Sequence, residues 1–413
     1  MSRRIDDAER RARLGIRHHL APRPSFAPSP AAVARAADPA AEAPAVAPAC
    51  LAADLVGLHA TDPASVYLEA WARIAGFERT DLDRALYEDR SVVRMIAMRR
   101  TLFVLPVELV PLADAACARA IAGRERRRLV GWLTEAGIGG ADPGRWLRRV
   151  EGDTLAALEV RGEAAANELT PAVPELRERI SFGEGKRWAG SFGVSTRVLM
   201  LLAMEGRIVR ARPRGSWVSG QYRYAPADRW LPADRPRPST EEAQSELVRR
   251  WLGSFGPGTE ADLAWWSGLT LREIRRALAS LPVTEVELED GSRGLVLSDD
   301  LHPVDPPEPW VALVPGLDAT TMGWTRRSWY LGPHGGRLFD TNGNAGPTIW
   351  VDGRIVGGWG QRPDGEVVVH ILEDIGRDAR SAIEARAAQL TAWVDGLRVT
   401  PRFRTPLEVE LGG

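Results

Sequence analysis

Apolar positions in the first hundred residues mostly recur three and four residues apart, the spacing of helices that face a core. This pattern predicts helices over 7–20, 51–58, 65–74 and 80–86. A further helix is expected to carry Val92, Val93, Ile96 and Met98, followed by an extended run from Thr101 to Leu105. Three helices and a strand in this order are typical of a winged helix-turn-helix.

The same order of elements is predicted a second time. A helix is expected to open at Asp153, another spans 167–180, and Ser195 is expected to cap a helix to about Glu205. Side chains then alternate over 208–212 and 217–224, on either side of a turn that contains Gly215, which predicts a hairpin. A helix followed at once by a hairpin rich in arginine is the arrangement of a recognition helix and its wing.

Capping signals mark a third set of helices. Ser239 with Glu242 and Thr270 with Glu273 form capping boxes, and Thr259 can cap a helix over 260–266. A hairpin follows, and its turn is at Asp290-Gly291. The repetition lies in the order of elements and not in residue identity.

Short strands and tight turns dominate 308–413, where Asp352-Gly353 and Asp364-Gly365 are hairpin signals. A helix is predicted over 377–395, and 407–411 alternates as a closing strand. The sequence therefore predicts an α+β protein with tandem winged helix-turn-helix units and a β-rich, barrel-like C-terminal domain. The expected domain ranges are 1–150 with an Ala/Pro-rich insertion at 21–50, 151–236, 237–305 and 306–413.

Composition limits the possible partners and the cellular location. The chain has 413 residues, 54 basic and 55 acidic, so any nucleic-acid footprint must be local. Its two cysteines are far apart in sequence, and adjacent His18 and His19 point apart on a helix, so we expect no disulfide framework, no metal site and no cofactor. With no apolar signal core and no run long enough for a membrane span, we expect a cytoplasmic, nucleoid-associated protein.

The predicted wing carries the residue types that hold DNA. Guanidinium groups pair with phosphates, and aromatic rings lie against sugars or bases. The candidates on the wing are Arg210, Arg212, Arg214, Trp217, Gln221 and Tyr222, and Arg100 is a further candidate beside the helix expected after Asp89. The alternative is a solvated hairpin with its aromatic rings buried beneath, and the run Arg124–Arg128 is interpreted as a solvated helix face.

The segments 57–68, 98–104, 212–224, 342–346 and 357–365 together resemble the AlkZ/YcaQ-like winged-helix superfamily. The resemblance covers nearly the whole chain except 21–50. It implies tandem winged helices with a β-barrel, and a monofunctional DNA glycosylase that excises N7-alkylated purines or unhooks interstrand crosslinks. By the same resemblance, the hairpin tipped by Gln361 and Arg362 corresponds to a minor-groove probe, although an ordinary hairpin explains it as well.

The resemblance also singles out one loop. In those enzymes it carries Gln-x-Gln or Gln-x-Asp, thought to hold a water against the sugar C1′, and here His59 and Thr61 take these places. An imidazole can orient or deprotonate water, and a hydroxyl can hold it. Asp62 is a third candidate, or else the cap of the next helix, and His59 is alternatively a buried imidazole bonded to a carbonyl.

The favoured hypothesis is a monomeric glycosylase that grips duplex DNA on an arginine-edged surface, with Arg100, Arg212 and Arg362 on the backbone. A non-catalytic DNA binder, either lesion-shielding or regulatory, is the main alternative. A small-molecule or interaction protein on the same scaffold is the third possibility.

Overall fold

The computed structural model describes residues 3–22, 47–182, 185 and 189–413, so most of the predicted insertion at 21–50 lies outside the described part. The chain divides into two compact units. The first unit combines Met1–Leu82 with Ser245–Gly413, and the second is Asp83–Gln244. The first unit therefore draws on both ends of the chain, while the division into four domains remains a prediction. Among the described residues, none of the helices has the length and apolar character that a membrane crossing requires.

The N-terminal part of the first unit is helical, as the apolar spacing predicts. Its elements are β1 (Arg4–Ile5), α1 (Asp7–Arg17), α3 (Pro48–Asp54), β2 (Leu58–His59), α4 (Ser65–Arg73) and α5 (Arg79–Tyr87), which runs into the second unit. Asp6 caps α1, since its carboxylate accepts from the Glu9 N–H at 2.8 Å.

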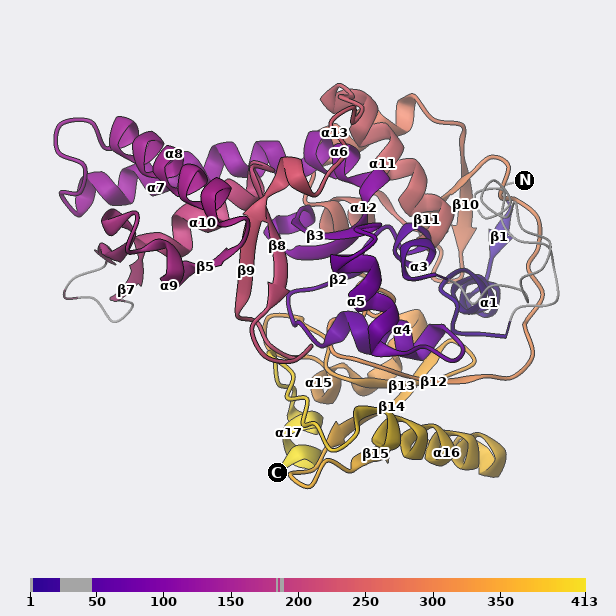
Figure 1. Ribbon diagram of the computed structural model, residues 1–413. Helices are drawn as coiled ribbons and strands as arrows, with labels where there is room; N and C mark the ends of the chain where they lie inside the picture. The colour runs from indigo at the N-terminus through magenta and orange to yellow at the C-terminus, as the bar shows by residue number, and fades with distance from the viewer. Residues whose placement is uncertain (1–2, 23–46, 183–184, 186–188) are drawn as a thin grey trace, which may run out of the picture. The chain divides into compact units, whose positions relative to one another are not determined.

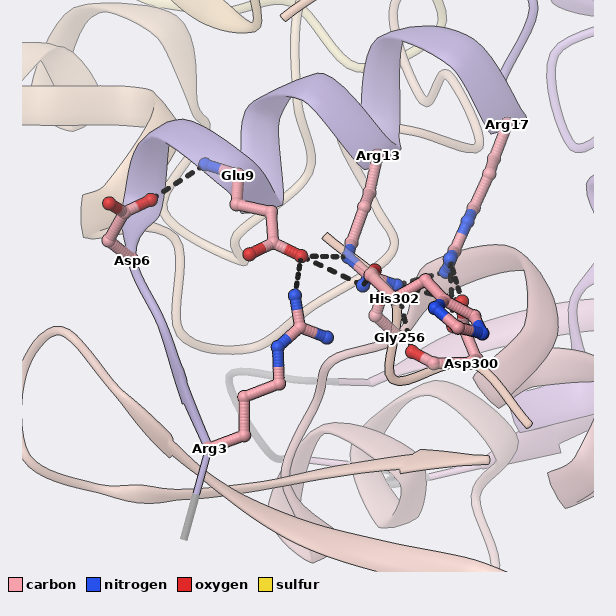
Figure 2. Close-up of polar contacts among 8 residues, drawn as sticks. All are labelled: Arg3, Asp6, Glu9, Arg13, Arg17, Gly256, Asp300 and His302. Atoms are coloured by element: carbon pink, nitrogen blue, oxygen red, sulfur yellow. Dashed lines mark hydrogen bonds and ion pairs between the residues drawn. The ribbon is translucent and has the colours of Figure 1, made fainter. Parts of the chain in front are cut away.

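Figure 2 shows how α1 is fastened to the segment around Asp300. The Arg13 side chain is buried and donates to the Asp300 carboxylate and the His302 carbonyl at 2.8 and 2.7 Å. Arg17, one turn later, donates to both oxygens of Asp300 at 2.7 Å. These bonds join residues that are 283–289 positions apart in the sequence, so they connect the two chain segments of the first unit.

The third predicted set of helices is confirmed. Its elements are α11 (Thr240–Phe255), α12 (Glu260–Ser267), α13 (Leu271–Ala279), β10 (Val283–Leu288) and β11 (Arg293–Leu297). All three predicted caps form, and the Thr259 and Thr270 capping boxes close with Asp262 and Glu273. The strand β1 adds to this hairpin in parallel with β10.

The C-terminal strands form one antiparallel sheet in the order β12-β13-β14-β15, visible in the lower part of Figure 1. The strands are β12 (Val311–Val314), β13 (Thr348–Val351), β14 (Arg354–Gln361) and β15 (Val367–Ile371). The predicted helix is confirmed as α16 (Gly376–Val394), which packs on β12 and β15. The mixed α+β class predicted from the sequence is confirmed.

The predicted closing strand at 407–411 is wrong, because these residues form α17 (Pro406–Gly412). Proline at the first helical position favours a helix start, and Leu407 and Leu411 are four residues apart, so one helix face carries both. Leu407 is buried against β14, and Glu408 bonds back to Arg404.

In the second unit the predicted helix over 92–98 is wrong. This stretch is β3 (Val92–Ile96), which pairs antiparallel with the correctly predicted strand, β4 (Leu102–Pro106). Every residue of both strands is buried, so side-chain periodicity could not distinguish strand from helix. The connecting turn, η1 (Met98–Arg100), holds Arg99 and Arg100 at φ of 52° and 62°.

The rest of the second unit is a helical layer with small sheets. Its elements are η2 (Val107–Leu109), α6 (Val110–Ala113), η3 (Asp114–Ala118), α7 (Arg119–Glu135), α8 (Pro143–Arg161), β5 (Ala164–Ala165), α9 (Ala166–Leu169), η4 (Pro174–Arg177), β6 (Arg179–Phe182), β7 (Gly190–Gly193), α10 (Val194–Met204), β8 (Ile208–Pro213), β9 (Tyr222–Pro226) and η5 (Ala227–Arg229). The helices α7 and α8 lie side by side (Figure 1).

Three predictions in this region need correction. The helix expected over 167–180 is instead two short turns and the start of β6, because prolines interrupt it. The helix α8 begins at Pro143 and not at Asp153, and α10 is capped by Gly193 and not by Ser195. The buried face predicted for α10 is confirmed.

Candidate active site and nucleic-acid interface

The loop between α3 and α4 is held in place by backbone conformation and by its neighbours. Val56 and Gly57 have φ of 52° and 107°, so the chain reverses before it enters β2. At the far end, the Ser65 hydroxyl donates to the Gly316 carbonyl at 2.8 Å. The loop is therefore fixed to the segment that follows β12 of the C-terminal sheet.

Asp62 fixes this loop and has little capacity left for chemistry. Its two carboxylate oxygens accept from the backbone N–H groups of Ala64 and Arg402, at 3.2 and 3.0 Å. Burial raises the pKa of Asp62, and these two hydrogen bonds oppose the rise. This geometry fits a structural role for Asp62, but Asp62 is not the predicted helix cap, since α4 begins at Ser65 with Ala64 at its N-cap.

His59 and Thr61 differ in their exposure. His59 is 5% exposed and lies on β2, whereas Thr61 is partly exposed. The Thr61 hydroxyl oxygen is itself buried and has no hydrogen-bond partner among the described residues. A buried hydroxyl left unsatisfied costs about 1–3 kcal/mol, so Thr61 has unused bonding capacity.

An ion pair without solvent access lies under this loop. Both side chains are 0% exposed, and the Arg73 guanidinium on α4 holds the Asp318 carboxylate with two hydrogen bonds of 2.8 Å. The Thr320 hydroxyl accepts from the same guanidinium at 2.9 Å. Sequence reasoning missed this pair, because its members are 245 positions apart and neither belongs to a motif.

Four of the predicted DNA-binding arginines, Arg100, Arg212, Arg214 and Arg362, are exposed, and each is paired with a carboxylate. Arg212 donates to Asp83 at 2.9 Å and Arg100 to Glu125 at 3.0 Å. Arg214 pairs with Glu168, and Arg362 with Glu366. Each guanidinium is about half exposed, and exposed pairs contribute only about 0–1 kcal/mol, so a phosphate can take the place of the carboxylate.

Aromatic rings pack against the guanidinium groups of Arg94, Arg210 and Arg212 in the second unit. The Tyr222 ring lies 5.2 Å from the Arg94 guanidinium carbon and 5.5 Å from that of Arg210. The Tyr87 ring lies 4.5 Å from that of Arg212. Tyr222 thus packs among cations, which the sequence did not predict. Trp217 lies in the turn before β9, and Gln221 is exposed next to that strand.

A second arginine group, the Glu125 cluster, consists of Arg100, Arg128 and Arg197 around Glu125. Arg128 lies 3.8 Å from the Glu125 carboxylate, and the Arg197 guanidinium lies over the Phe192 ring at 4.2 Å. Burial lowers the pKa of Arg197; the Glu125 charge opposes this, and the charges of Arg100 and Arg128 lower it further. The local excess of positive charge suits an anion. The run Arg124–Arg128 was a signal for it, but no sequence pattern marks Arg197.

Gln361 does not face a duplex, which corrects the expectation for this residue. It is 5% exposed, and its amide N–H donates to the carbonyls of Gly365 and Leu397 at 2.8 and 3.0 Å. Its amide oxygen accepts from the Val399 N–H at 2.7 Å. Gln361 therefore shapes the hairpin from inside, and Arg362 beside it is the exposed residue.

Comparison with known proteins assigns the chain to a family. The model of the AlkZ-like DNA glycosylase family matches residues 52–393. The interstrand DNA cross-link repair glycosylase of Streptomyces sahachiroi is 25% identical over 354 residues, covering 82% of this chain and 90% of that protein. The solved structure of the S. sahachiroi DNA glycosylase AlkZ has the same fold, with a TM-score of 0.68 at 22% identity over 96% of this chain and 98% of that one. Because the family model covers most of the chain, including the His59 loop and the C-terminal sheet, this protein belongs to the AlkZ-like DNA glycosylase family.

Proposed function

We propose that this protein is a monofunctional DNA glycosylase that hydrolyses the N-glycosidic bond of N7-alkylated or crosslinked purines in duplex DNA. The observation that carries the proposal is the family match over 52–393, which includes both the His59 loop and the sheet to which it is fixed. The crosslink-repair relative from S. sahachiroi supports this substrate class.

Hydrolysis of this N-glycosidic bond requires few catalytic groups from the His59 loop. An N7-alkylated purine is cationic and leaves without an acid, so the enzyme must place a water at C1′ and stabilise an oxocarbenium-like sugar. The C1′–N9 bond breaks with its electrons going to the purine, and the water oxygen bonds to C1′. The His59 imidazole would take the proton of that water, and the Thr61 hydroxyl would hold its oxygen, while Asp62 keeps the loop in shape.

The arginines would hold the duplex without reading its sequence. Phosphates would compete with the exposed carboxylates for Arg100, Arg212, Arg214 and Arg362. Arg210, beside the Tyr222 ring, would add a further contact. Binding by backbone contacts alone suits a repair enzyme, which meets lesions in any sequence, and it needs no second copy of the chain. We therefore propose a monomer acting on double-stranded DNA.

The direct test is incubation of the protein with duplex DNA that contains N7-methylguanine. Released base and abasic sites are measured for wild type, for His59→Ala, and for His334→Ala as a control histidine that pairs with Glu373. Release by wild type and by the control, but not by His59→Ala, is the expected result. No release by wild type would overturn the glycosylase, and equal release by His59→Ala would overturn the role of His59.

The burial of His59 favours one second candidate, a DNA-binding protein without base excision. At 5% exposure the imidazole is little accessible to a substrate. Such a protein would bind alkylated duplex with the same arginines and shield it. Tight binding without release of base, or a sharp preference for one sequence in a binding selection, would favour this candidate.

A further inference from the structure

The carboxyl group of Glu69 is buried next to the candidate catalytic loop. Glu69 is 0% exposed, and among the described residues no hydrogen bond of standard geometry reaches either of its carboxyl oxygens. The polar groups that face the carboxyl are the backbone N–H groups of His59 and Ala319. A buried polar group without firm partners calls for a specific physical explanation.

The nearby cation cannot neutralise Glu69. All five N–H donors of Arg73 are already used. They go to the Asp318 carboxylate, the Thr320 hydroxyl, and the backbone carbonyls of His18 and Glu69, at 2.8–3.1 Å. The cluster therefore holds one guanidinium and two carboxyl groups without solvent access.

Histidine supplies no second positive charge. The His18 ring is buried between the Thr320 hydroxyl at 2.8 Å and the Ser254 carbonyl at 3.2 Å. The carbonyl can only accept, so Nε2 carries the hydrogen and Nδ1 accepts from Thr320. Burial, and then the Arg73 charge, hold the pKa of His18 well below its usual range, so the ring is neutral.

We propose that Glu69 is a positioning residue that works in its neutral form: it supports the backbone at His59, and its ionisation at high pH lowers the rate of base release. An uncompensated carboxylate next to that of Asp318 is unfavourable in a dry cluster, so ionisation of Glu69 disturbs the packing that supports the loop. Burial, and then the Asp318 charge, raise the pKa of Glu69 well above its ordinary value, against the opposing effects of the Arg73 charge and of the backbone N–H groups of Ala319 and His59. The proposal rests on the proposed glycosylase function.

The test compares Glu69→Gln, which copies the neutral form, with Glu69→Ala and wild type. Single-turnover release of N7-methylguanine is measured from pH 6 to 10, after subtraction of spontaneous loss. We expect the wild-type rate to fall at alkaline pH, Glu69→Gln to stay within about twofold of wild type at pH 7 without that fall, and Glu69→Ala to lose at least about tenfold. A fall of the same size in Glu69→Gln, or none in wild type, would overturn the proposal.

A second readout does not depend on activity. A raised folded pKa means that the folded protein binds the proton more strongly than the unfolded chain. Stability should therefore fall as pH rises from about 4.5, the ordinary Glu value, through the folded pKa. Glu69→Gln should lack this component in urea unfolding, whereas Glu246→Gln, a partly exposed control, should keep it. Equal slopes for wild type and Glu69→Gln would show that Glu69 is ionised. If wild type releases no base, the proposed function fails, yet this arm still decides the charge of Glu69.

Discussion

Two kinds of arginine–carboxylate pair in this protein have similar distances and opposite environments. The pair Arg73–Asp318 under the His59 loop is 0% exposed on both sides, whereas in Arg212–Asp83 at the wing the guanidinium is 49% exposed. Breaking a buried pair leaves a charge without water, but an exposed pair exchanges partners at little cost. The first can therefore hold a loop in one shape, and the second can give its arginine to a phosphate. Distance alone would not separate these two functions.

The largest effect is expected when the buried cation is removed, which tests whether burial distinguishes the two pairs. Arg73→Met leaves the Asp318 carboxylate buried without its partner, and we expect a loss of about 3–5 kcal/mol in the free energy of unfolding. Urea titration followed by tryptophan fluorescence measures it. Arg212→Met is the matched exposed control, with an expected loss of about 0–1 kcal/mol. Equal losses for the two variants would show that burial does not distinguish the pairs.

An intermediate case is the carboxylate of Asp300, shared by Arg13 and Arg17 on α1. Asp300→Ala removes the acceptor of the buried Arg13 guanidinium, and we expect a loss of about 1–3 kcal/mol by the same titration. Glu285→Ala, which removes the partner of the exposed Arg293, should change stability little. A loss for Asp300→Ala no greater than for Glu285→Ala would contradict the fastening of α1.

The pH dependence sharpens the account of the buried cluster. The folded pKa of His18 is lowered below the ordinary value of 6.5, so the unfolded chain binds the proton and stability is lost as pH falls below about 6.5. The slope from this residue is at most about 1.4 kcal/mol per pH unit. His18→Gln should flatten it, while His334→Gln should not. An acid slope unchanged in His18→Gln would mean that His18 is charged when folded.

The exposed arginines should affect binding much more than stability. Arg100→Gln, Arg212→Gln and Arg214→Gln should each reduce the slope of log binding constant against log salt by about 0.9, with little change in the urea midpoint. Arg293→Gln serves as the exposed control on β11. Salt slopes that stay at the wild-type value would remove these residues from the DNA interface.

Local sequence signals predicted much of the fold, and the prediction failed where contacts outside the segment determine its structure. The three caps at Ser239, Thr259 and Thr270 are confirmed, since a capping box is satisfied within four residues of sequence. The sequence wrongly predicts a helix at Val92–Ile96, because a short and fully buried run has no polar face that would show its period. Only the pairing with β4, a contact outside the run itself, determines its structure.

The candidate site was predicted less well, because its environment is made by distant contacts. Family resemblance located the loop at His59, but nothing in the sequence indicates that Glu69 meets Asp318 or that Gln361 is buried in its hairpin. The left-handed turn at Arg99 and Arg100 carries no glycine that would have marked it. The carboxylate partners of Arg100 and Arg212 come from other elements of the fold, so no local pattern indicates these pairs.

The central claim is that the first unit performs base release and the arginines of the second unit bind DNA. Single-turnover release of N7-methylguanine, measured across protein concentrations, separates the two parameters. For His59→Ala we predict a fall of about 100-fold or more in the rate at saturation with little change in affinity. For the triple variant Arg100→Gln, Arg212→Gln, Arg214→Gln we predict weaker affinity with the saturated rate largely kept. A result in which His59→Ala releases base at the wild-type rate, or in which both variants lose only affinity, would contradict the account.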